Sequence, residues 1–233
     1  MKGWFVTGTD TGVGKTRVSC ALLDALTVAG VPAVGMKPVA SGCEPSAAGP
    51  RNADAEALRA ASSVRADYAD VNPYAFPAAT APHLAALATG VTIDIAHVCR
   101  SYARLTGLAP CVVVEGIGGW LVPISRSQTM ADVAAALGLP VILVVGVRLG
   151  AINHALLTAR EIRTCGLKLV AWVANRIDPD PILDDYVPAL GHLLDLPLLG
   201  SFPYDPAAAK AGSQSFLDLS QLGFADPAEK SSY

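Results

Sequence analysis

The stretch GTDTGVGKT, residues 8–16, lies between an apolar run, GWFVTG (3–8), and an alanine-rich segment over 15–29 that has the composition of a helix. Backbone N–H groups in a glycine-rich turn of this kind converge on phosphate oxygens, and the N-terminus of the following helix adds a favourable dipole. Lys15 is placed to reach the outer phosphates, and the Thr16 hydroxyl to coordinate Mg²⁺. The motif predicts a phosphate-binding loop between a first strand and a first helix.

This loop is a variant of the common phosphate-loop pattern. Five residues separate Gly8 from Gly14, where the common pattern has four, and Thr9 stands where the first glycine would be. The alternative interpretation is an ordinary glycine turn that joins a strand to a helix. The strand before the turn, the helix after it and the intact Gly-Lys-Thr together favour the phosphate loop.

The rest of the chain repeats the alternation of strand and helix. Most of the apolar runs are nearly continuous, as in strands of a parallel sheet that is covered on both faces. Strands are expected, besides the first, in PAVGMK (32–37), CVVVEG (111–116), PVILVVG (140–146), LVAWVAN (169–175) and PLLGSF (197–202). Helices that stop at or just before a glycine are expected over 15–29, 95–106, 130–137 and 151–165.

This order of elements predicts an α/β fold with a doubly wound, mainly parallel sheet and helices on both faces, similar to P-loop NTPases. We expect a single domain over 1–233, of which the tail over 206–233 has only weak periodicity. The segments 38–53 and 67–83 are rich in Pro, Gly, Ser and Asn, and we expect them to be long loops or lids.

The composition excludes several classes of protein. Hydrophobic residues make up 52% and charged residues 16%, which excludes disorder as the main state. The formal net charge of -3 lacks the basic excess of a general nucleic-acid binder. No apolar run reaches the roughly 18 residues of a membrane span, and the first residues show no signal-peptide core. The five cysteines form no C-x-x-C pair, so we expect reduced thiols in a cytoplasmic protein without nucleic-acid or membrane partners.

In open α/β sheets ligands bind at the carboxyl ends of the strands, so the residues that follow each strand form one candidate surface. Lys37 ends the second expected strand, and Glu115 ends a later one, where an acid can hold Mg²⁺ against nucleotide phosphates. Gly116 and Gly118 permit a close approach of the backbone to a ligand. From the residues alone, a plain surface lysine is an equal alternative for Lys37, and an ordinary first-turn helix acid is the favoured interpretation of Asp54.

Seven stretches follow one another in collinear order between about residues 3 and 206: FVTGTDTGVGKT (5–16), GMKPVASG (35–42), RNADA (51–55), VNPYAF (71–76), VVVEGIGGWLVP (112–123), PVILVVGVRLGAINHALLTA (140–159) and AWVAN (171–175). Together they closely resemble one family, the dethiobiotin synthetases, which are ATP-dependent carboxylases of biotin biosynthesis. The phosphate loop alone would not specify this family, but the set does. Gly12 departs from members that carry an acidic residue at that position.

The resemblance implies which residues hold each ligand. Lys37 and Lys15 would be the catalytic residues, and Mg²⁺ would be held by Thr16, Asp54 and Glu115. The substrate would be bound by Thr11, Lys37 and Ser41 and, from a neighbouring subunit, by Gly150, Ala151 and Asn153. ATP would be bound by Gly12, Val13, Gly14, Lys15, Thr16, Arg17, Asp54, Glu115, Gly116, Ile117, Gly118, Asn175, Arg176, Pro203, Tyr204 and Asp205.

The reaction that the resemblance implies joins CO₂ to 7,8-diaminononanoate. One amine forms a carbamate, ATP phosphorylates the carbamate, and the second amine closes a cyclic urea to give dethiobiotin, ADP and phosphate. The family works as a homodimer. The diamine supplies both nucleophiles, which agrees with the lack of a G-x-S-x-G elbow in this chain. Because Lys37 sits at a strand end, we expect its replacement to change folding little.

Two other classes share parts of the pattern. Regulatory ATPase switches of the ParA/MinD type have a similar variant loop, but with a signature lysine where this chain has Asp10. The chain also shows no basic amphipathic C-terminal helix for membrane docking. The cobyrinate amidotransferases have a similar synthetase domain but need a further glutaminase domain. A pure nucleotide-binding module would leave Lys37, Ser41 and Asn153 without a purpose.

Overall fold

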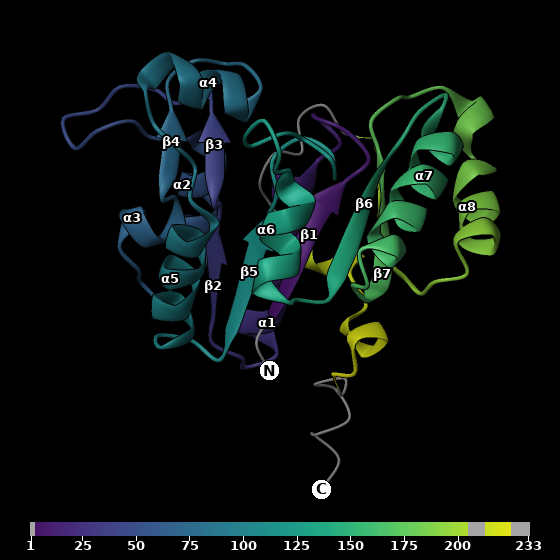
Figure 1. Cartoon of the computed structure of the whole chain (residues 1–233). Coiled ribbons are helices and arrows are strands. Elements are labelled where there is room, and N and C mark those ends of the chain that lie inside the picture. Colours follow the sequence, from purple (N-terminus) through teal and green to yellow (C-terminus); the bar gives the residue numbers. More distant parts are fainter. Residues whose placement is uncertain (1–2, 205–212, 225–233) are drawn as a thin grey trace, which may run out of the picture.

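Figure 1 shows the computed structural model of the chain, which describes residues 3–204 and 213–224. A six-stranded sheet runs through its centre in the order β2-β5-β1-β6-β7-β8, and all neighbouring strands are parallel. These strands match the six predicted runs to within one residue at each end, so the predicted parallel sheet is confirmed. They are β1 (Gly3–Gly8), β2 (Ala33–Met36), β5 (Cys111–Glu115), β6 (Val141–Val147), β7 (Leu169–Arg176) and β8 (Leu198–Phe202).

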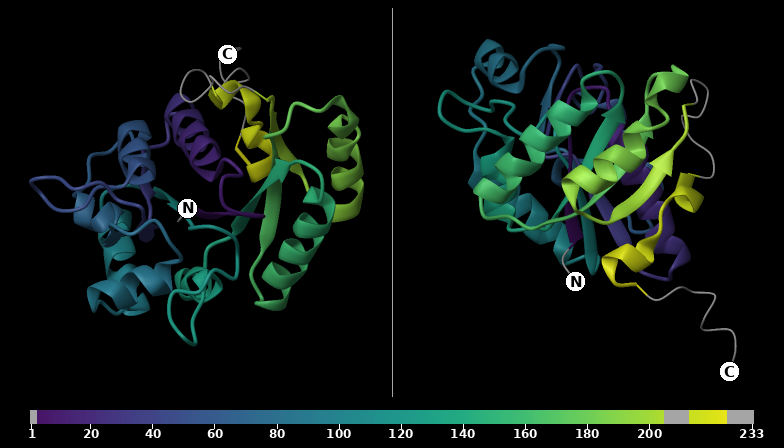
Figure 2. Two further views of the ribbon diagram at one scale, coloured as in Figure 1. Left: turned by 90° about the horizontal axis from the view of Figure 1, so that it is seen from above. Right: turned by 90° about the vertical axis from the view of Figure 1, so that its right-hand side faces the viewer.

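Both faces of the five strands from β2 to β7 in the sheet are buried, which explains why these strands are largely apolar, whereas the edge strand β8 is buried on one face only. In β1, Phe5 packs into the core on one face, whereas Trp4 and Val6 pack into the core on the other. Four helices cover the first face, and α1 covers the second together with the short turns η2 and η3 (Figure 2). Their bounds are α1 (Lys15–Val28), α5 (Ile95–Thr106), α6 (Met130–Leu137), α7 (Ala151–Thr164), α8 (Tyr186–Leu194), η2 (Ser213–Phe216) and η3 (Leu219–Leu222).

Local signals set the ends of the predicted helices. The side chain of Asp94 accepts a hydrogen bond from the backbone N–H of Ala96 at 2.8 Å and so caps α5. At the start of α6, Thr129 and Asp132 form a capping box. The helix ends at Gly138, which takes the left-handed conformation with φ 63°. The helices predicted over 15–29, 95–106, 130–137 and 151–165 are therefore present as α1, α5, α6 and α7.

The segments 38–53 and 67–83 are more regular than predicted. Part of each forms a strand, and β3 pairs in parallel with β4 in a separate two-stranded sheet. The Asn72 side chain ties this unit to the main sheet, because its Nδ2 donates to the main-chain oxygen of Lys37 at 2.7 Å. The elements of this region are β3 (Val39–Ser41), α2 (Ala53–Ala61), α3 (Tyr68–Val71), β4 (Tyr74–Phe76) and α4 (Pro82–Thr89).

The carboxyl ends of the parallel strands meet at the upper edge of the sheet in Figure 1. The phosphate loop leaves β1 at this edge, Glu115 ends β5 there, and the short turn η1 (Pro181–Leu183) follows β7. This arrangement brings segments that are distant in the sequence to one surface. In the described ranges, 3–204 and 213–224, no helix has the length and apolarity needed to cross a membrane.

Candidate active site

Glycine conformations and one amide side chain hold the phosphate loop in place. Gly12 (φ 75°) and Gly14 (φ 89°) both take the left-handed conformation that glycine tolerates. Asn175, at the end of β7, donates from Nδ2 to the main-chain oxygen of Val13 at 2.9 Å. A Cβ atom added at Gly14 would lie 2.1 Å from that Nδ2. Because α1 begins at Lys15, its first-turn N–H groups face the loop without helical acceptors and are available to an anion.

The Lys15 side chain turns back into the loop. Its Nζ donates to the main-chain oxygen of Asp10 at 2.9 Å, and the residue is only 6% exposed. Burial, and then repulsion from Lys37, lowers the pKa of Lys15 to about 8. A phosphate in the loop would favour the charged form of this amine, because a nearby anion raises the pKa of an ammonium group.

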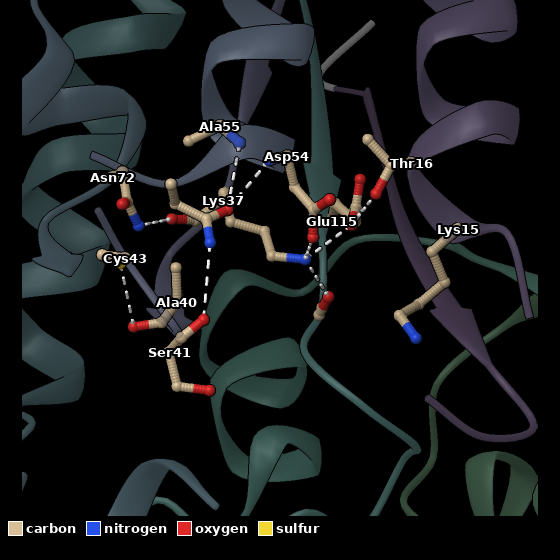
Figure 3. Close-up of polar contacts among 12 residues, drawn as sticks. Lys15, Thr16, Lys37, Ala40, Ser41, Cys43, Asp54, Ala55, Asn72 and Glu115 are labelled. Carbon is tan, nitrogen blue, oxygen red and sulfur yellow. Dashed lines mark hydrogen bonds and ion pairs between the residues drawn. The ribbon is translucent and has the colours of Figure 1, made fainter. Parts of the chain in front are cut away.

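Lys37 lies at the centre of a buried polar cluster (Figure 3). Its Nζ donates to Glu115 Oε1 at 2.6 Å, to Asp54 Oδ2 at 3.0 Å and to the main-chain oxygen of Gly116 at 3.1 Å. Thr16 Oγ1 donates to the same Glu115 Oε1 at 2.9 Å. The sheet, α1 and α2 thus bring together all three predicted metal ligands and Lys37, one of the two predicted catalytic lysines.

The charges in this cluster depend on one another. Burial alone would lower the pKa of Lys37, but Glu115 and Asp54 outweigh it and the pKa is raised. Burial works in the opposite direction on Asp54, whose pKa is nevertheless lowered, mainly by the charge of Lys37. Removing one partner of a buried ion pair leaves an uncompensated charge and costs about 3–5 kcal/mol. The burial of Lys37 therefore contradicts the expectation that its replacement changes folding little.

The oxygen atoms of the cluster fit a magnesium ion. Glu115 is fully buried, and its Oε2 atom has no hydrogen-bond partner. A buried carboxylate oxygen without a partner is unfavourable unless a cation or water satisfies it. In the described part of the chain, no group of three or more His, Cys, Asp or Glu side chains could hold a metal alone. Proteins commonly bind Mg²⁺ through one or two carboxylates together with substrate phosphates, and the cluster contains the carboxylates of Asp54 and Glu115.

A cavity of ≈ 670 Å³ lies beside the cluster. Thr11 and Ser41, two of the predicted substrate-binding residues, line it together with Lys15 and Lys37. Its other walls come from segments that the sequence analysis did not place at the site, Asn52 and residues 79–82 at the start of α4. The predicted ATP-binding residues that also line this cavity are Gly12, Gly14, Thr16, Asp54, Glu115, Ile117 and Gly118.

A second cavity, of ≈ 840 Å³, lies at the carboxyl ends of β7 and β8. Arg17 connects it to the phosphate loop, because its Nη1 donates to Asn175 Oδ1 at 3.1 Å and to the main-chain oxygen of Pro203 at 3.2 Å. Asp205 lies outside the described residues. The predicted ATP-binding residues that line this cavity are Arg176, Pro203 and Tyr204.

Three predicted substrate-binding residues lie apart from both cavities. Gly150, with φ 89°, is the N-cap of α7, and Ala151 begins that helix. Asn153 is exposed in the first helical turn. None of the three lines either cavity within the described chain. The chain by itself therefore does not bring them to the cavity that Lys37 lines.

Comparison with known proteins identifies the family. The chain is 51% identical, over 217 residues, to ATP-dependent dethiobiotin synthetase BioD of Xanthomonas euvesicatoria, covering 93% of this chain and 97% of the relative. The chain belongs to the dethiobiotin synthetase family. The enzyme of the same name from Nitrosospira multiformis is 48% identical, with coverage of 95% and 97%. A family model described as an AAA domain matches residues 2–211.

Solved structures outside the dethiobiotin synthetase family share the fold. The MinC:MinD cell division complex of Aquifex aeolicus matches with a TM-score of 0.57 at 13% identity, covering 94% of this chain and 88% of the other. A ParA family ATPase from Chlorobium tepidum matches with a TM-score of 0.53 at 15% identity, covering 92% and 88%. At these identities the similarity shows the P-loop type of α/β fold and nothing about activity.

One polar contact at the dethiobiotin synthetase site was missed by the sequence analysis. Arg148, between β6 and α7, donates from Nη2 to Asp10 Oδ2 at 2.8 Å. The second oxygen of the same carboxylate accepts the N–H of Thr11 at 2.7 Å. Asp10 therefore restrains the loop through both oxygen atoms of its carboxylate. Both residues stood in segments that follow predicted strands, which is the signal that could have paired them.

We predict that Gly14→Ala lowers the free energy of unfolding more than Gly12→Ala does. Both glycines have positive φ, so each substitution strains the backbone by about 1–3 kcal/mol. Only the Cβ atom at Gly14 meets Asn175, and breaking the Asn175–Val13 hydrogen bond adds about 1 kcal/mol. Urea denaturation of both variants measures the difference.

The control is the same pair of substitutions in an Asn175→Ala background. There the clash is absent, and the two glycine variants should become equally unstable. A difference that persists without the Asn175 side chain would show that this amide does not restrain the loop.

Proposed function

We propose that this protein is an ATP- and Mg²⁺-dependent dethiobiotin synthetase that acts as a cytoplasmic homodimer on 7,8-diaminononanoate and CO₂. The observation that carries the proposal is Lys37, which lies between two carboxylates beside the phosphate loop and on the wall of the first cavity. Membership of the dethiobiotin synthetase family supports the same assignment.

The proposed reaction proceeds in three bond-forming steps. An amine of the substrate attacks CO₂ and loses a proton to give a carbamate. A carbamate oxygen then attacks the γ-phosphorus of ATP, and ADP leaves. The second amine attacks the carbonyl carbon of the resulting anhydride, and inorganic phosphate leaves as the cyclic urea closes. The substrate provides each nucleophile, so the protein needs to supply no covalent residue.

The difficult step is electrostatic, because a carbamate must approach a γ-phosphate when both are anions. Lys15 and Lys37 both line the first cavity, and two ammonium groups there offset this repulsion and stabilise the transferred charge. We assign Thr11 and Ser41, on the walls of the same cavity, to hold the diamine or its carbamate. Burial excludes water from Lys37, which strengthens its interaction with the reacting oxygens.

We assign Thr16, Asp54 and Glu115 to hold Mg²⁺ together with phosphate oxygens of ATP. The unpartnered Oε2 atom of Glu115 supports this assignment. When bound, the ion supplies positive charge that neutralises the phosphates during transfer. Asp54 and Glu115, two of these proposed metal ligands, also form ion pairs with Lys37. The ammonium group of Lys37 therefore helps to neutralise the same two carboxylates.

We place ATP along the loop with its base in the second cavity, near Asn175, Arg176, Pro203 and Tyr204. The arrangement of Arg17 between the loop and this cavity supports that path. We infer a cytoplasmic location from the cysteine spacing in the sequence, which contains no C-x-x-C pair. Cell fractionation checks the location.

The proposed dimer completes each substrate site with the N-terminus of α7 from the neighbouring subunit. Free N–H groups at a helix start favour a carboxylate, and the diamine carries one at its far end. Leu149 and Leu157 keep 78% and 58% of their surface exposed beside Asn153, so an apolar area is available to a second copy. This assignment explains why the three predicted residues lie apart from the cavity of their own chain.

The direct test of the proposed function is incubation with ATP, Mg²⁺, bicarbonate and 7,8-diaminononanoate, followed by mass spectrometry. We expect dethiobiotin, with one ADP and one phosphate per product. Under the same conditions, Lys37→Gln should lower kcat by on the order of 10²–10³, because it removes a preorganised donor from the reacting phosphate. Lys168→Gln, at an exposed lysine, is the matched control and should retain full activity.

Because Lys37 is buried, the assay of Lys37→Gln is accompanied by a melting curve and run below the midpoint of unfolding. The double variant Lys37→Gln, Glu115→Gln removes the uncompensated charge and should recover part of the lost stability without recovering activity. A folded Lys37→Gln protein with near-normal kcat would falsify the catalytic role.

The metal assignment predicts that Asp54→Asn and Glu115→Gln each raise the Mg²⁺ concentration needed for half-maximal ATP binding. A neutral amide is a weaker ligand for a hard cation than a carboxylate. Isothermal titration with ATP at varied Mg²⁺ measures the change. Glu56→Gln, two residues from Asp54 on the outside of α2, is the control. An unchanged titration in either test variant removes that residue from the site.

The dimer assignment predicts that mixed subunits complement each other. Asn153→Leu alone should raise the KM for the diamine and leave ATP affinity unchanged. Heterodimers of Lys37→Gln and Asn153→Leu chains have one intact site and one doubly damaged site, so activity should exceed that of either parent. Activity equal to the parental average, after subunit exchange is confirmed, contradicts a site shared between subunits.

A further inference from the structure

The second cavity has a wall from the C-terminal segment of the chain. Phe216, at the end of η2, lines it together with Phe202 of β8. The two rings lie 5.4 Å apart with an angle of 50° between their planes. Phe202 is only 1% exposed, whereas Phe216 keeps 38% of its surface accessible. Phe202 is therefore a core residue. Phe216, like Tyr204, is an aromatic side chain that a molecule in the cavity can contact.

The backbone around Phe216 is fixed against the edge of the sheet. The N–H of Asp218 donates to the main-chain oxygen of Leu199 at 2.8 Å, and Leu217 forms an antiparallel bridge with Gly200. A Cβ atom added at Gly200 would lie 2.0 Å from the main-chain oxygen of Phe216. Only glycine permits so close an approach, so the position of the Phe216 backbone depends on Gly200.

A continuous set of contacts leads from the phosphate loop to this wall. Arg17, in the first turn of α1, places its guanidinium group 5.0 Å from the centre of the Phe202 ring. The same group donates to Asn175, which holds the loop at Val13. In Figure 2 the C-terminal segment, in yellow, lies beside α1 and the edge of the sheet. A nucleotide with its phosphates in the loop would thus extend toward Phe216.

We propose that Phe216 is a positioning residue for the nucleotide, forming an aromatic wall on which the base stacks, and that the C-terminal segment is part of the nucleotide site. This inference rests on the proposed function only in requiring that the loop binds a nucleoside triphosphate. Stacking uses the flat face that every base has, so this contact strengthens binding without selecting one base. Recognition of the base itself is left to polar groups of the cavity such as Arg176.

The alternative is that Phe216 only shields Phe202 from water. In that case its loss would lower stability and leave ligand affinity unchanged. The two interpretations predict different changes in affinity for a ligand that has a base and for one that does not. Inorganic tripolyphosphate is a ligand without a base.

The experiment compares the dissociation constants of Mg·ATP and Mg·tripolyphosphate by isothermal titration. Phe216→Ala should weaken ATP binding by about 5- to 100-fold, the range that loss of one base–aromatic stack produces, and leave tripolyphosphate binding unchanged. GTP and CTP should weaken by the same factor as ATP. Gly200→Ala displaces Phe216 without altering its ring and should give the same pattern.

Two further variants separate stacking from general damage. Phe216→Trp should keep the ATP affinity and add a fluorescence change on ATP binding that the wild-type protein lacks. Phe224→Ala is the matched control, because this ring contacts Trp4 at 5.9 Å and does not line the cavity. It should lower the melting temperature and leave the dissociation constant of ATP unchanged.

The inference is overturned if folded Phe216→Ala binds ATP as tightly as the wild-type protein, or if it loses tripolyphosphate affinity by the same factor. Either result leaves the proposed function intact. A wild-type protein that binds neither ligand overturns the proposed function and this inference together.

Discussion

The ammonium group of Lys37 is the interaction on which the rest of the site depends. It is almost fully buried, so its charge requires acceptors on several sides, and these are supplied by Glu115, Asp54 and the carbonyl of Gly116. The acceptors come from β5 and α2, which are distant in the sequence. Closing this cluster therefore fixes the ends of two strands and one helix relative to one another. The same cluster places Thr16, and with it the start of α1.

The two lysines at the site show how the environment sets the charge of a group. Lys15 has a lowered pKa because it is buried against a carbonyl oxygen and repelled by Lys37. Lys37 is buried more completely, yet its pKa is raised because two carboxylates contact it directly. The charge of Lys37 is thus already balanced by carboxylates, whereas Lys15 is the ammonium group whose charged form an incoming phosphate would stabilise most. That asymmetry suits a site that binds an anionic nucleotide at its phosphate loop.

The main sheet was predictable because all of its strands except the edge strand β8 are covered on both faces, which makes their sequences largely apolar. The pair of short strands, β3 and β4, was missed since each lies in a segment rich in residues typical of loops. The helix α8 was also missed. Its sequence contains Pro188 and Gly191, which oppose a helix in a sequence window, but Pro188 falls in the first turn, where no N–H is needed.

The sequence by itself determined the phosphate loop, the parallel sheet and the family. Glycine spacing and apolar runs can be read within short segments, and the family motifs can be read from their order along the chain. Asp54 is different. By spacing it resembles an ordinary first-turn acid of α2, and only the tertiary structure brings its carboxylate to Lys37. Phe216 likewise has no local signal, since its role follows from the close approach of its backbone to Gly200. Contacts between separate elements are decided by packing and charge burial, which no single segment encodes.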